Sequence, residues 1–190
     1  MCMTSGPRER LIYSTIELVR TRGVEGAGLK ELLEHSGTAR RSIYQHFPGG
    51  KAELVVASIN AAGTWIRRGL RDLSASGDPA FVIKTIVDQT LKDLVDNDYR
   101  LGCPVAAAAG TTTATPEILG ASAAVFESWT DELATALERA GRAPAEARSL
   151  AGFAVSAIEG ALLRARCARS PEPLEQAAKH LHDILAPVET

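Results

Sequence analysis

The chain has 190 residues, 45% of them hydrophobic, and its 21 basic side chains stand against 23 acidic ones for a net charge of −2. This size and composition indicate one or two globular domains and exclude a fibre or a disordered chain. No apolar leader and no stretch of ~18 apolar residues is visible, so we expect a cytoplasmic protein without a transmembrane segment.

Charge is unevenly distributed along the chain. Residues 1–71 hold eleven basic and six acidic side chains, a net +5, whereas residues 72–190 hold ten and seventeen, a net −7. A basic first third joined to an acidic remainder indicates two parts with different partners, and a polyanion suits the first. A solvated basic face is the alternative interpretation.

Cysteine and histidine are too scattered for a metal or redox centre. Cys2, Cys103 and Cys167 form no CxxC pair, so reduced thiols are expected. His180 and His182 would point about 200° apart on a helix, which argues against a shared metal ion. No metal site and no cofactor are predicted.

Helical periodicity runs through the whole chain, and no alternating run of β-branched residues indicates a strand. We therefore predict an all-α fold of about nine helices. The first extends from Pro7 to about Arg22 and ends at Gly23 in a left-handed conformation. The second, from Leu29 to His35, is short and ends at Ser36-Gly37.

The third helix is predicted to have two distinct faces. Thr38 is expected to cap it and Pro48-Gly49-Gly50 to end it. Its inward face is predicted to hold Ala39, Ile43 and Phe47. Its outward face and flanks are predicted to hold Arg40, Arg41, Tyr44 and Gln45.

Six further helices follow from start and stop signals. They are expected from Lys51 to about Ser74, from Ser76-Gly77-Asp78-Pro79 to Asn97-Asp98, briefly within 101–113, from a Thr115 cap to Ala140-Gly141, from Pro144 to about Cys167, and from Ser170-Pro171-Glu172 to about Leu185.

Residues 29–47 have the anatomy of a helix-turn-helix, with a short amphipathic helix, a turn at Gly37 and a basic, polar second helix. Such a second helix fits the DNA major groove. Arg40, Arg41 and Gln45 are the residue types that read guanine and adenine edges. Thr38, Tyr44 and Lys51 are predicted to hold phosphates, and Lys51 follows Gly49-Gly50 where free N–H groups favour an anion.

Several motifs in residues 8–54 resemble the DNA-binding domain of the TetR family of transcriptional regulators. The similar segments are Ile16 to Val19 with Gly23, Leu29 to Gly37, the Ser42 to Phe47 block S-I-Y-Q-H-F, and Lys51 with Leu54. Pro48-Gly49-Gly50-Lys51 and Gly102-Cys103-Pro104-Val105 further resemble the LmrA/YxaF-type branch, which is often linked to control of efflux genes.

The resemblance implies roles for individual residues. Lys30, Arg40 and Gln45 occupy base-contact or groove positions, and Thr38, Ser42, Tyr44, His46 and Lys51 occupy backbone-contact positions. Two positions depart from the family pattern: Gly28 replaces a frequent phosphate-contacting Thr, and Arg41 replaces a frequent Gly. Packing against the core is the alternative role for Tyr44 and His46, and a solvated surface for the two arginines.

The resemblance also implies a domain division. Residues 1–50 are expected to form the DNA-binding domain and residues 51–190 the ligand-binding and dimerisation domain, connected by the helix over 51–75. Candidate walls of an apolar effector cavity are Trp65, Phe81, Cys103, Val105, Phe126 and Trp129, although each also suits a plain core. Candidate dimer contacts are Ala154, Ala157, Ile158, Ala161, Leu162, Ala165, Leu181, Ile184 and Leu185.

The expected function is that of a homodimeric repressor that binds a palindromic operator and releases it when a small apolar effector binds. The main alternative is a thiol-responsive regulator that senses through Cys103. An enzyme is not supported, because no catalytic triad, carboxylate pair or metal constellation has usable spacing. A nonspecific DNA-packaging protein would bind operator and random DNA alike.

Overall fold

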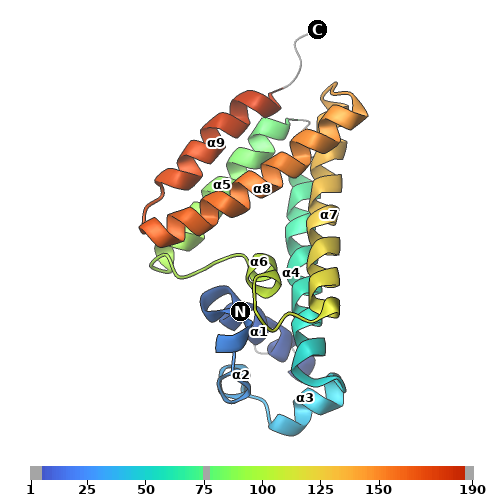
Figure 1. Ribbon diagram of the computed structural model, residues 1–190, viewed down its shortest axis with the longest axis vertical. Coiled ribbons are helices and arrows are strands. Elements are labelled where there is room, and N and C mark those ends of the chain that lie inside the picture. Colours follow the sequence, from blue (N-terminus) through green and yellow to red (C-terminus); the bar gives the residue numbers. More distant parts are fainter. Residues whose placement is uncertain (1–5, 75–77, 187–190) are drawn as a thin grey trace. The chain divides into compact units, whose positions relative to one another are not determined.

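The computed structural model describes residues 6–74 and 78–186, and within these ranges the chain folds into nine α-helices without a strand (Figure 1). The all-α prediction is therefore confirmed. The helices are α1 Pro7–Gly26, α2 Leu29–Ser36, α3 Arg40–His46, α4 Gly50–Ser74, α5 Pro79–Asp96, α6 Pro104–Ala109, α7 Pro116–Arg139, α8 Pro144–Ala168 and α9 Glu172–Leu185. No helix in the described ranges is both long and apolar enough to span a membrane.

The helices gather into two compact units. The first consists of residues up to Thr64 together with Cys103–Val125, and the second of Trp65–Gly102 together with residues from Phe126 onward. Helices α4 and α7 each contribute one part to either unit. The predicted boundary at residue 50 separates a DNA-binding domain from a ligand-binding domain by their functions. The packing units do not test this boundary, so it stays a prediction.

In the first unit, α1 is the central helix against which the others pack. Helices α2, α3 and α6 all contact it, as Figure 1 shows. The core contains Leu11 of α1, Ile43 of α3 and Leu54 of α4, each fully buried. The Ser58 hydroxyl of α4 donates to the Ile12 carbonyl at 3.4 Å. The end of α3 and the start of α4 are therefore held to one scaffold helix.

Two terminal signals in this unit were misread. The first helical segment of α1 does stop at Gly23, but not in the predicted left-handed conformation: the chain takes φ 73° and ψ 177° there, kinks, and a second short helical segment extends to Gly26. The positive φ explains the glycine, but it makes a break within the helix rather than a left-handed end. The residue before α3 is Ala39, which forms no side-chain cap, and the predicted cap Thr38 instead shares a 2.8 Å hydrogen bond with the Ser36 hydroxyl.

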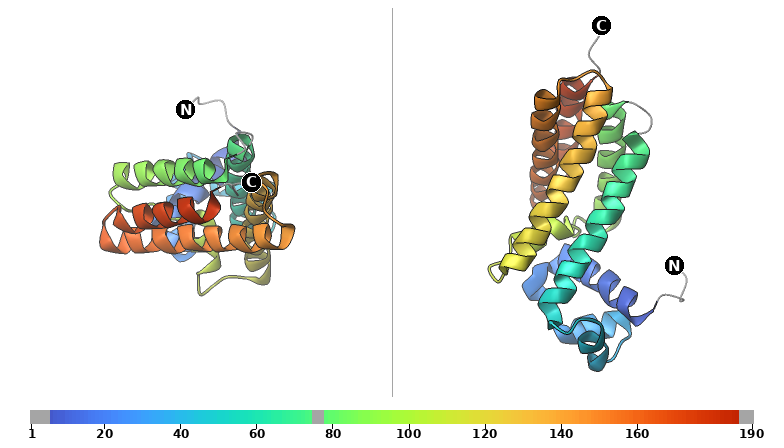
Figure 2. Two further views of the ribbon diagram at one scale, coloured as in Figure 1. Left: turned by 90° about the horizontal axis from the view of Figure 1, so that it is seen from above. Right: turned by 90° about the vertical axis from the view of Figure 1, so that its right-hand side faces the viewer.

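In the second unit, α5, α8 and α9 lie side by side, with α9 packed against both of the others (Figure 2). Leu94, Leu137, Leu174 and Leu181 are completely or almost completely buried there. The Arg142 guanidinium donates at 3.0 Å to the carbonyls of Ile184 and Ala186, at the C-terminal end of α9. This satisfies acceptors that a helix end leaves unpaired.

The predicted start signals of α5 and α7 are confirmed for those of their residues that the structure describes. Asp78 accepts hydrogen bonds from the N–H groups of Ala80 and Phe81, at 3.0 and 3.2 Å. Thr115 accepts from the Ile118 N–H at 3.5 Å. Ser76 and Gly77, which were also part of the predicted signal, lie outside the described residues, as does Cys2.

A close approach of α4 and α7 within the first unit depends on Gly63. A β-carbon at this position would lie 2.6 Å from both methyl groups of Val125 and 3.2 Å from its β-carbon, which no side-chain rotation moves. We expect Gly63→Ala to lower the free energy of unfolding by about 1–3 kcal/mol despite alanine's better helix propensity. Urea denaturation followed by circular dichroism measures this. The double variant Gly63→Ala with Val125→Ala should regain stability relative to Gly63→Ala alone, and a further loss would refute the steric explanation.

Candidate nucleic-acid interface

The turn between α2 and α3 is set by one glycine. Gly37 adopts φ 60° and ψ 35°, the left-handed conformation, and its N–H donates to the Leu33 carbonyl to close α2. The chain then turns through Thr38 and Ala39 into α3. The predicted helix-turn-helix geometry is therefore present, and we refer to α3 as the recognition helix.

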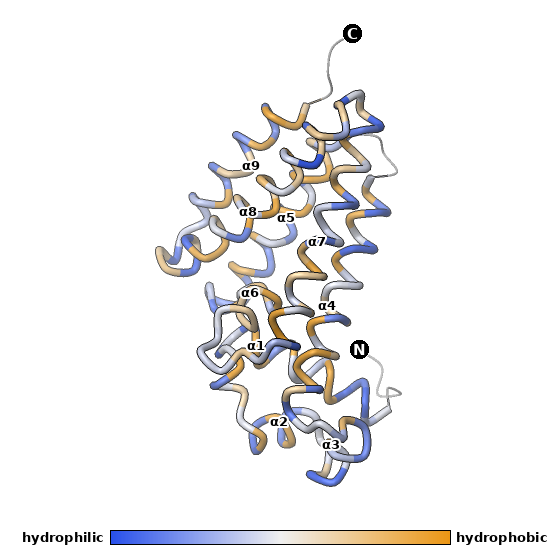
Figure 3. Tube along the Cα trace, turned by 45° about the vertical axis from the view of Figure 1, so that its right-hand side comes forward, coloured by the Kyte–Doolittle hydropathy of each residue, from blue (hydrophilic) through white to orange (hydrophobic). Residues whose placement is uncertain are grey.

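The recognition helix has one buried and one solvent-exposed side. Ile43 is fully buried and Phe47, just after the helix, is 1% exposed. The predicted inward position of Ala39 is wrong, because Ala39 is exposed at the helix start, where the turn carries it away from the core. The exposed residues of the recognition helix are Arg40, Arg41, Tyr44, Gln45 and His46. Figure 3 shows this helix as largely hydrophilic.

Arg40 and Arg41 are exposed without a partner within residues 6–74 and 78–186. Other arginines of the same unit are engaged. Arg22 pairs with Glu31 at 2.5 Å, and Arg10 donates to the Ser36 carbonyl at 3.1 Å. Arg8 lies over the Phe47 ring, with its guanidinium carbon 5.3 Å from the ring centroid. The recognition helix therefore presents two unneutralised cations to solvent, which suits a polyanion.

The other predicted DNA contacts differ in availability. Tyr44 is 48% exposed, and His46 is exposed as well, so neither is a core residue. Lys30 is almost fully exposed and lies 3.9 Å from Glu34, an i,i+4 pair that costs little to break. Ser42 and Thr38 are half-buried. Their predicted contacts to the DNA backbone stay predictions.

Lys51 has an intramolecular role that sequence reasoning missed. Its ammonium group donates to the Val24 carbonyl at 2.6 Å, and it is half-buried. Partial burial lowers the pKa of Lys51, while the nearby Glu25 carboxylate opposes that shift. The same side chain thus ties the first turn of α4 to the end of α1. No sequence signal for this pairing exists, because the two residues are 27 positions apart.

The predicted effector residues are divided between the two units. Cys103 and Val105 are buried in the first unit, whereas Trp65, Phe81, Phe126 and Trp129 belong to the second. Trp65 and Phe81 are about half exposed. Trp129 is buried, and its ring meets that of Phe126 edge to face with centroids 5.3 Å apart.

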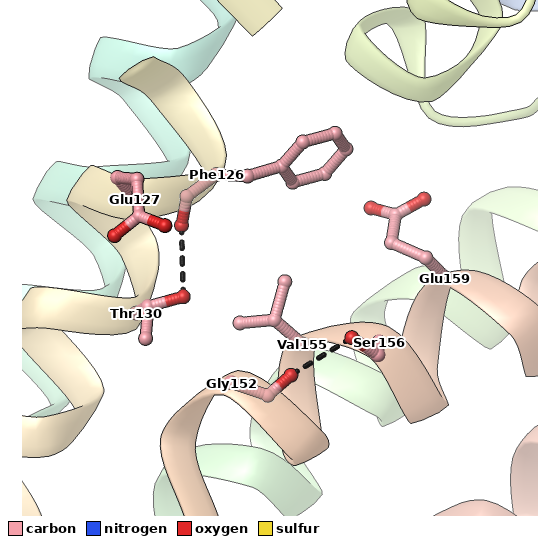
Figure 4. A pocket seen from close by; sticks show the side chains of 7 residues that line it. All are labelled: Phe126, Glu127, Thr130, Gly152, Val155, Ser156 and Glu159. Carbon is pink, nitrogen blue, oxygen red and sulfur yellow. Dashed lines mark hydrogen bonds between the residues drawn. The ribbon is translucent and has the colours of Figure 1, made fainter. Parts of the chain in front are cut away.

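The second unit has an open groove of about 390 Å³ between α7 and α8. Of the six predicted residues, only Phe126 lines it, and Figure 4 shows the Phe126 and Val155 side chains projecting into the space between the two helices. The remaining lining residues are Glu127, Thr130, Gly152, Ser156 and Glu159. Because the lining contains no cation, the groove suits an uncharged, partly apolar molecule better than a phosphate.

Most of the predicted dimer contacts pack inside the single chain. Ala154, Ala161, Leu162, Ala165, Leu181 and Leu185 are buried, Ala157 and Ile158 are half-buried, and Ile184 is 38% exposed. The exposed face of α8 instead holds Phe153, Ser156, Gly160, Leu163 and Cys167. We call these five residues the α8 stripe. Their spacing of three and four residues is a coiled-coil pattern visible in the sequence, but identical spacing also describes the buried face.

Cys103 is only 9% exposed and stands directly before α6. A thiol sensor needs access for an oxidant, and burial restricts it. A Cys103→Ser variant tests this alternative, because an unchanged response to oxidant would exclude it. No group of three or more His, Cys, Asp or Glu residues with metal-binding geometry occurs in the part of the chain that the structure describes.

Two family profiles match the chain. One, described as "Bacterial regulatory proteins, tetR family", covers residues 11–57, and the other, "Transcriptional regulator LmrA/YxaF-like, C-terminal domain", covers residues 79–180. The first match contains α2 and the recognition helix. The second extends from the start of α5 into α9.

Relatives match over nearly their full length. An uncharacterized HTH-type transcriptional regulator of Mycobacterium tuberculosis is 31% identical over 186 residues, which are 95% of this chain and 94% of that protein. The HTH-type transcriptional regulator LmrA of Bacillus subtilis is 27% identical over 180 residues, 94% and 96% of the two chains.

Solved structures share the fold. The regulatory protein TetR from Rhodobacter sphaeroides superposes with a TM-score of 0.83 at 24% identity, over 94% of this chain and 98% of that one. The reduced form of NemR from Escherichia coli superposes with a TM-score of 0.82 at 26% identity, over 96% and 99%.

Proposed function

This chain belongs to the TetR family of bacterial transcriptional regulators, in the LmrA/YxaF-like branch, and we propose that it acts as a homodimeric repressor of a palindromic operator. It is a DNA-binding regulator and not an enzyme. We further propose which residues read DNA, which surface forms the dimer and which class of effector binds.

The observation that carries the proposal is the unpartnered basic side of the recognition helix. Arg40 and Arg41 are the residue type that binds guanine O6 and N7 with two hydrogen bonds, and Gln45 on the same helix is the type that binds adenine N6 and N7. Lys30, Thr38, Ser42, Tyr44, His46 and Lys51 are proposed to contact phosphates or the groove wall and so to set the register of the helix.

The proposed dimer uses the α8 stripe together with Ile184 of α9. Phe153 and Leu163 are 54% and 59% exposed, large apolar side chains two to three helical turns apart on one face. Ser156 and Gly160 between them are small enough for a second helix to approach closely. One recognition helix by itself buries too little surface for specific DNA binding, and a two-fold dimer presents two of them to the operator. Half-sites about one helical turn apart, or further, are expected.

The proposed effector is a small, uncharged, largely apolar molecule that binds in the second unit. The groove supports this class of ligand, since Phe126 and Val155 give it apolar surface and the carboxylates of Glu127 and Glu159 disfavour an anion. Bound effector is proposed to change the spacing of the two recognition helices through α4, which contributes to both units. Release of DNA then follows from a lower affinity of the altered spacing for the operator.

A fluorescence-anisotropy titration tests the function directly. The full-length protein is titrated onto DNA from upstream of its own gene and of the neighbouring gene, with random DNA as competitor. We expect selective, salt-dependent binding to one upstream sequence. Equal, weak binding to all DNA would refute a site-specific repressor and favour a packaging protein. Once an operator is known, apolar compounds are screened for its release.

A further inference from the structure

The carboxylate of Glu25 is surrounded by hydrogen-bond donors from a distant segment. Its Oε1 atom accepts from the hydroxyl of Thr111, from the hydroxyl of Thr112 at 3.1 Å, and from the hydroxyl and backbone N–H of Thr113 at 3.1 and 3.3 Å. All these donors belong to the loop between α6 and α7, 86 to 88 positions further along the chain. We call this set of contacts the Glu25 latch.

The Glu25 carboxylate that accepts the hydrogen bonds of the latch is ionised at every physiological pH. Hydrogen bonds to a carboxylate are stronger than those between neutral groups. The Thr111 hydroxyl is the main cause that lowers the pKa of Glu25 from 4.5 to about 2. The lowered pKa means that the contribution of the latch to stability is complete above pH 4.5 and is lost only as the pH falls toward about 2.

The latch and Lys51 meet at the same short turn. Glu25 lies just after the kink at Gly23, and the adjacent Val24 carbonyl accepts the 2.6 Å hydrogen bond from Lys51. Lys51 is the second residue of α4, which begins only four positions after the recognition helix ends. The turn at Val24 and Glu25 therefore binds both the α6–α7 loop and the start of α4, which directly follows the recognition helix.

We propose that Glu25 is a positioning residue for operator binding, because its latch on the α6–α7 loop holds the turn that anchors α4 and the recognition helix. This inference rests on the proposed function. Without the latch, the turn and the recognition helix sample orientations that do not fit the major groove. The binding-competent fraction falls, and the apparent affinity falls in the same proportion.

The variant Glu25→Gln tests this role in the full-length protein. It keeps the shape of the side chain and removes its charge, and we expect operator binding about five- to tenfold weaker, with an unchanged dependence on salt. The sign is informative, because removing a negative charge near DNA would by itself strengthen binding. The matched control is Glu117→Gln, which removes the same charge from the first turn of α7, where the carboxylate interacts with Thr115 instead of the latch.

A second variant, Thr111→Val combined with Thr113→Val, removes donors without changing any charge and should weaken binding in the same direction. Hydrogen exchange of residues 110–115 in the protein alone should be faster in both latch variants. Binding by Glu25→Gln that equals or exceeds that of Glu117→Gln overturns the positioning role. A wild-type chain that binds all DNA alike overturns the proposed function and the role together, whereas unchanged exchange at 110–115 shows separately that the latch does not form.

Discussion

Replacing Arg40 with alanine is expected to weaken strongly the preference of the protein for its operator. Arg40 is exposed on the recognition helix and has no partner in the described part of the chain, so the change disturbs no internal contact. A two-hydrogen-bond contact to a base discriminates by about 1–3 kcal/mol, and a dimer on a palindrome makes it twice. The expected loss is therefore about 2–6 kcal/mol, or roughly thirtyfold and more in affinity.

Competition anisotropy with operator and random DNA measures this loss. Binding to random DNA should change little, because the phosphate contacts of the other residues remain. Arg139→Ala, which removes the same charge from the end of α7, is the matched control and should bind normally. The variant Arg41→Ala measures separately what the second exposed arginine of the recognition helix contributes. If Arg40→Ala and Arg139→Ala bind the operator equally well, the recognition helix does not read bases through Arg40.

A charge placed on the α8 stripe is expected to split the dimer. Leu163→Glu introduces a carboxylate at a side chain that is 59% exposed in the single chain, so folding of the protomer should be unaffected. In the proposed dimer the same position is buried, and an unpaired buried charge costs several kcal/mol at each of the two symmetric copies. Analytical ultracentrifugation should show a monomer, and operator affinity should fall to that of a single half-site.

The matched control for this variant is Val95→Glu on α5, because Val95 is equally an apolar side chain, 52% exposed, on a different helix. Circular dichroism establishes that both variants remain helical. Phe153→Glu should repeat the effect of Leu163→Glu. A Leu163→Glu protein that sediments as a dimer would move the interface away from the α8 stripe.

The positions of the helices could be predicted from local sequence signals. Thr115 and Pro116 start α7, Asp78 caps α5, and Gly37 ends α2 as expected, because each signal acts within a few residues of itself. The misreadings have equally local causes. Gly23 has the predicted positive φ and interrupts the helix, but its ψ of 177° makes a kink between two helical segments rather than a left-handed end. Thr38 bonds to Ser36 rather than capping the next helix.

The exposed surface of the recognition helix was predictable for the same reason. Ile43 and Phe47 are buried, and their spacing leaves Arg40, Arg41 and Gln45 on the outside whatever the rest of the chain does. The exposed face of α8 that we propose as the dimer surface was not predictable in this way. Helix α8 has apolar or small residues on more than one face, and only packing against α9 shows which of them are already covered. Leu162 is buried and its neighbour Leu163 is exposed, a distinction that hydrophobicity does not contain.

Sequence periodicity and capping thus decide the class of fold and the chemistry that the recognition helix offers to DNA, because both depend on neighbours within one or two helical turns. Other features depend on residues that are remote in sequence. These are the contact of Lys51 with Val24, the contact of Glu25 with the α6–α7 loop, and the choice of which face of α8 is buried. Such contacts are selected by the close packing of whole helices, where burial, available donors and excluded volume must be satisfied together. For that reason only the tertiary structure reveals them.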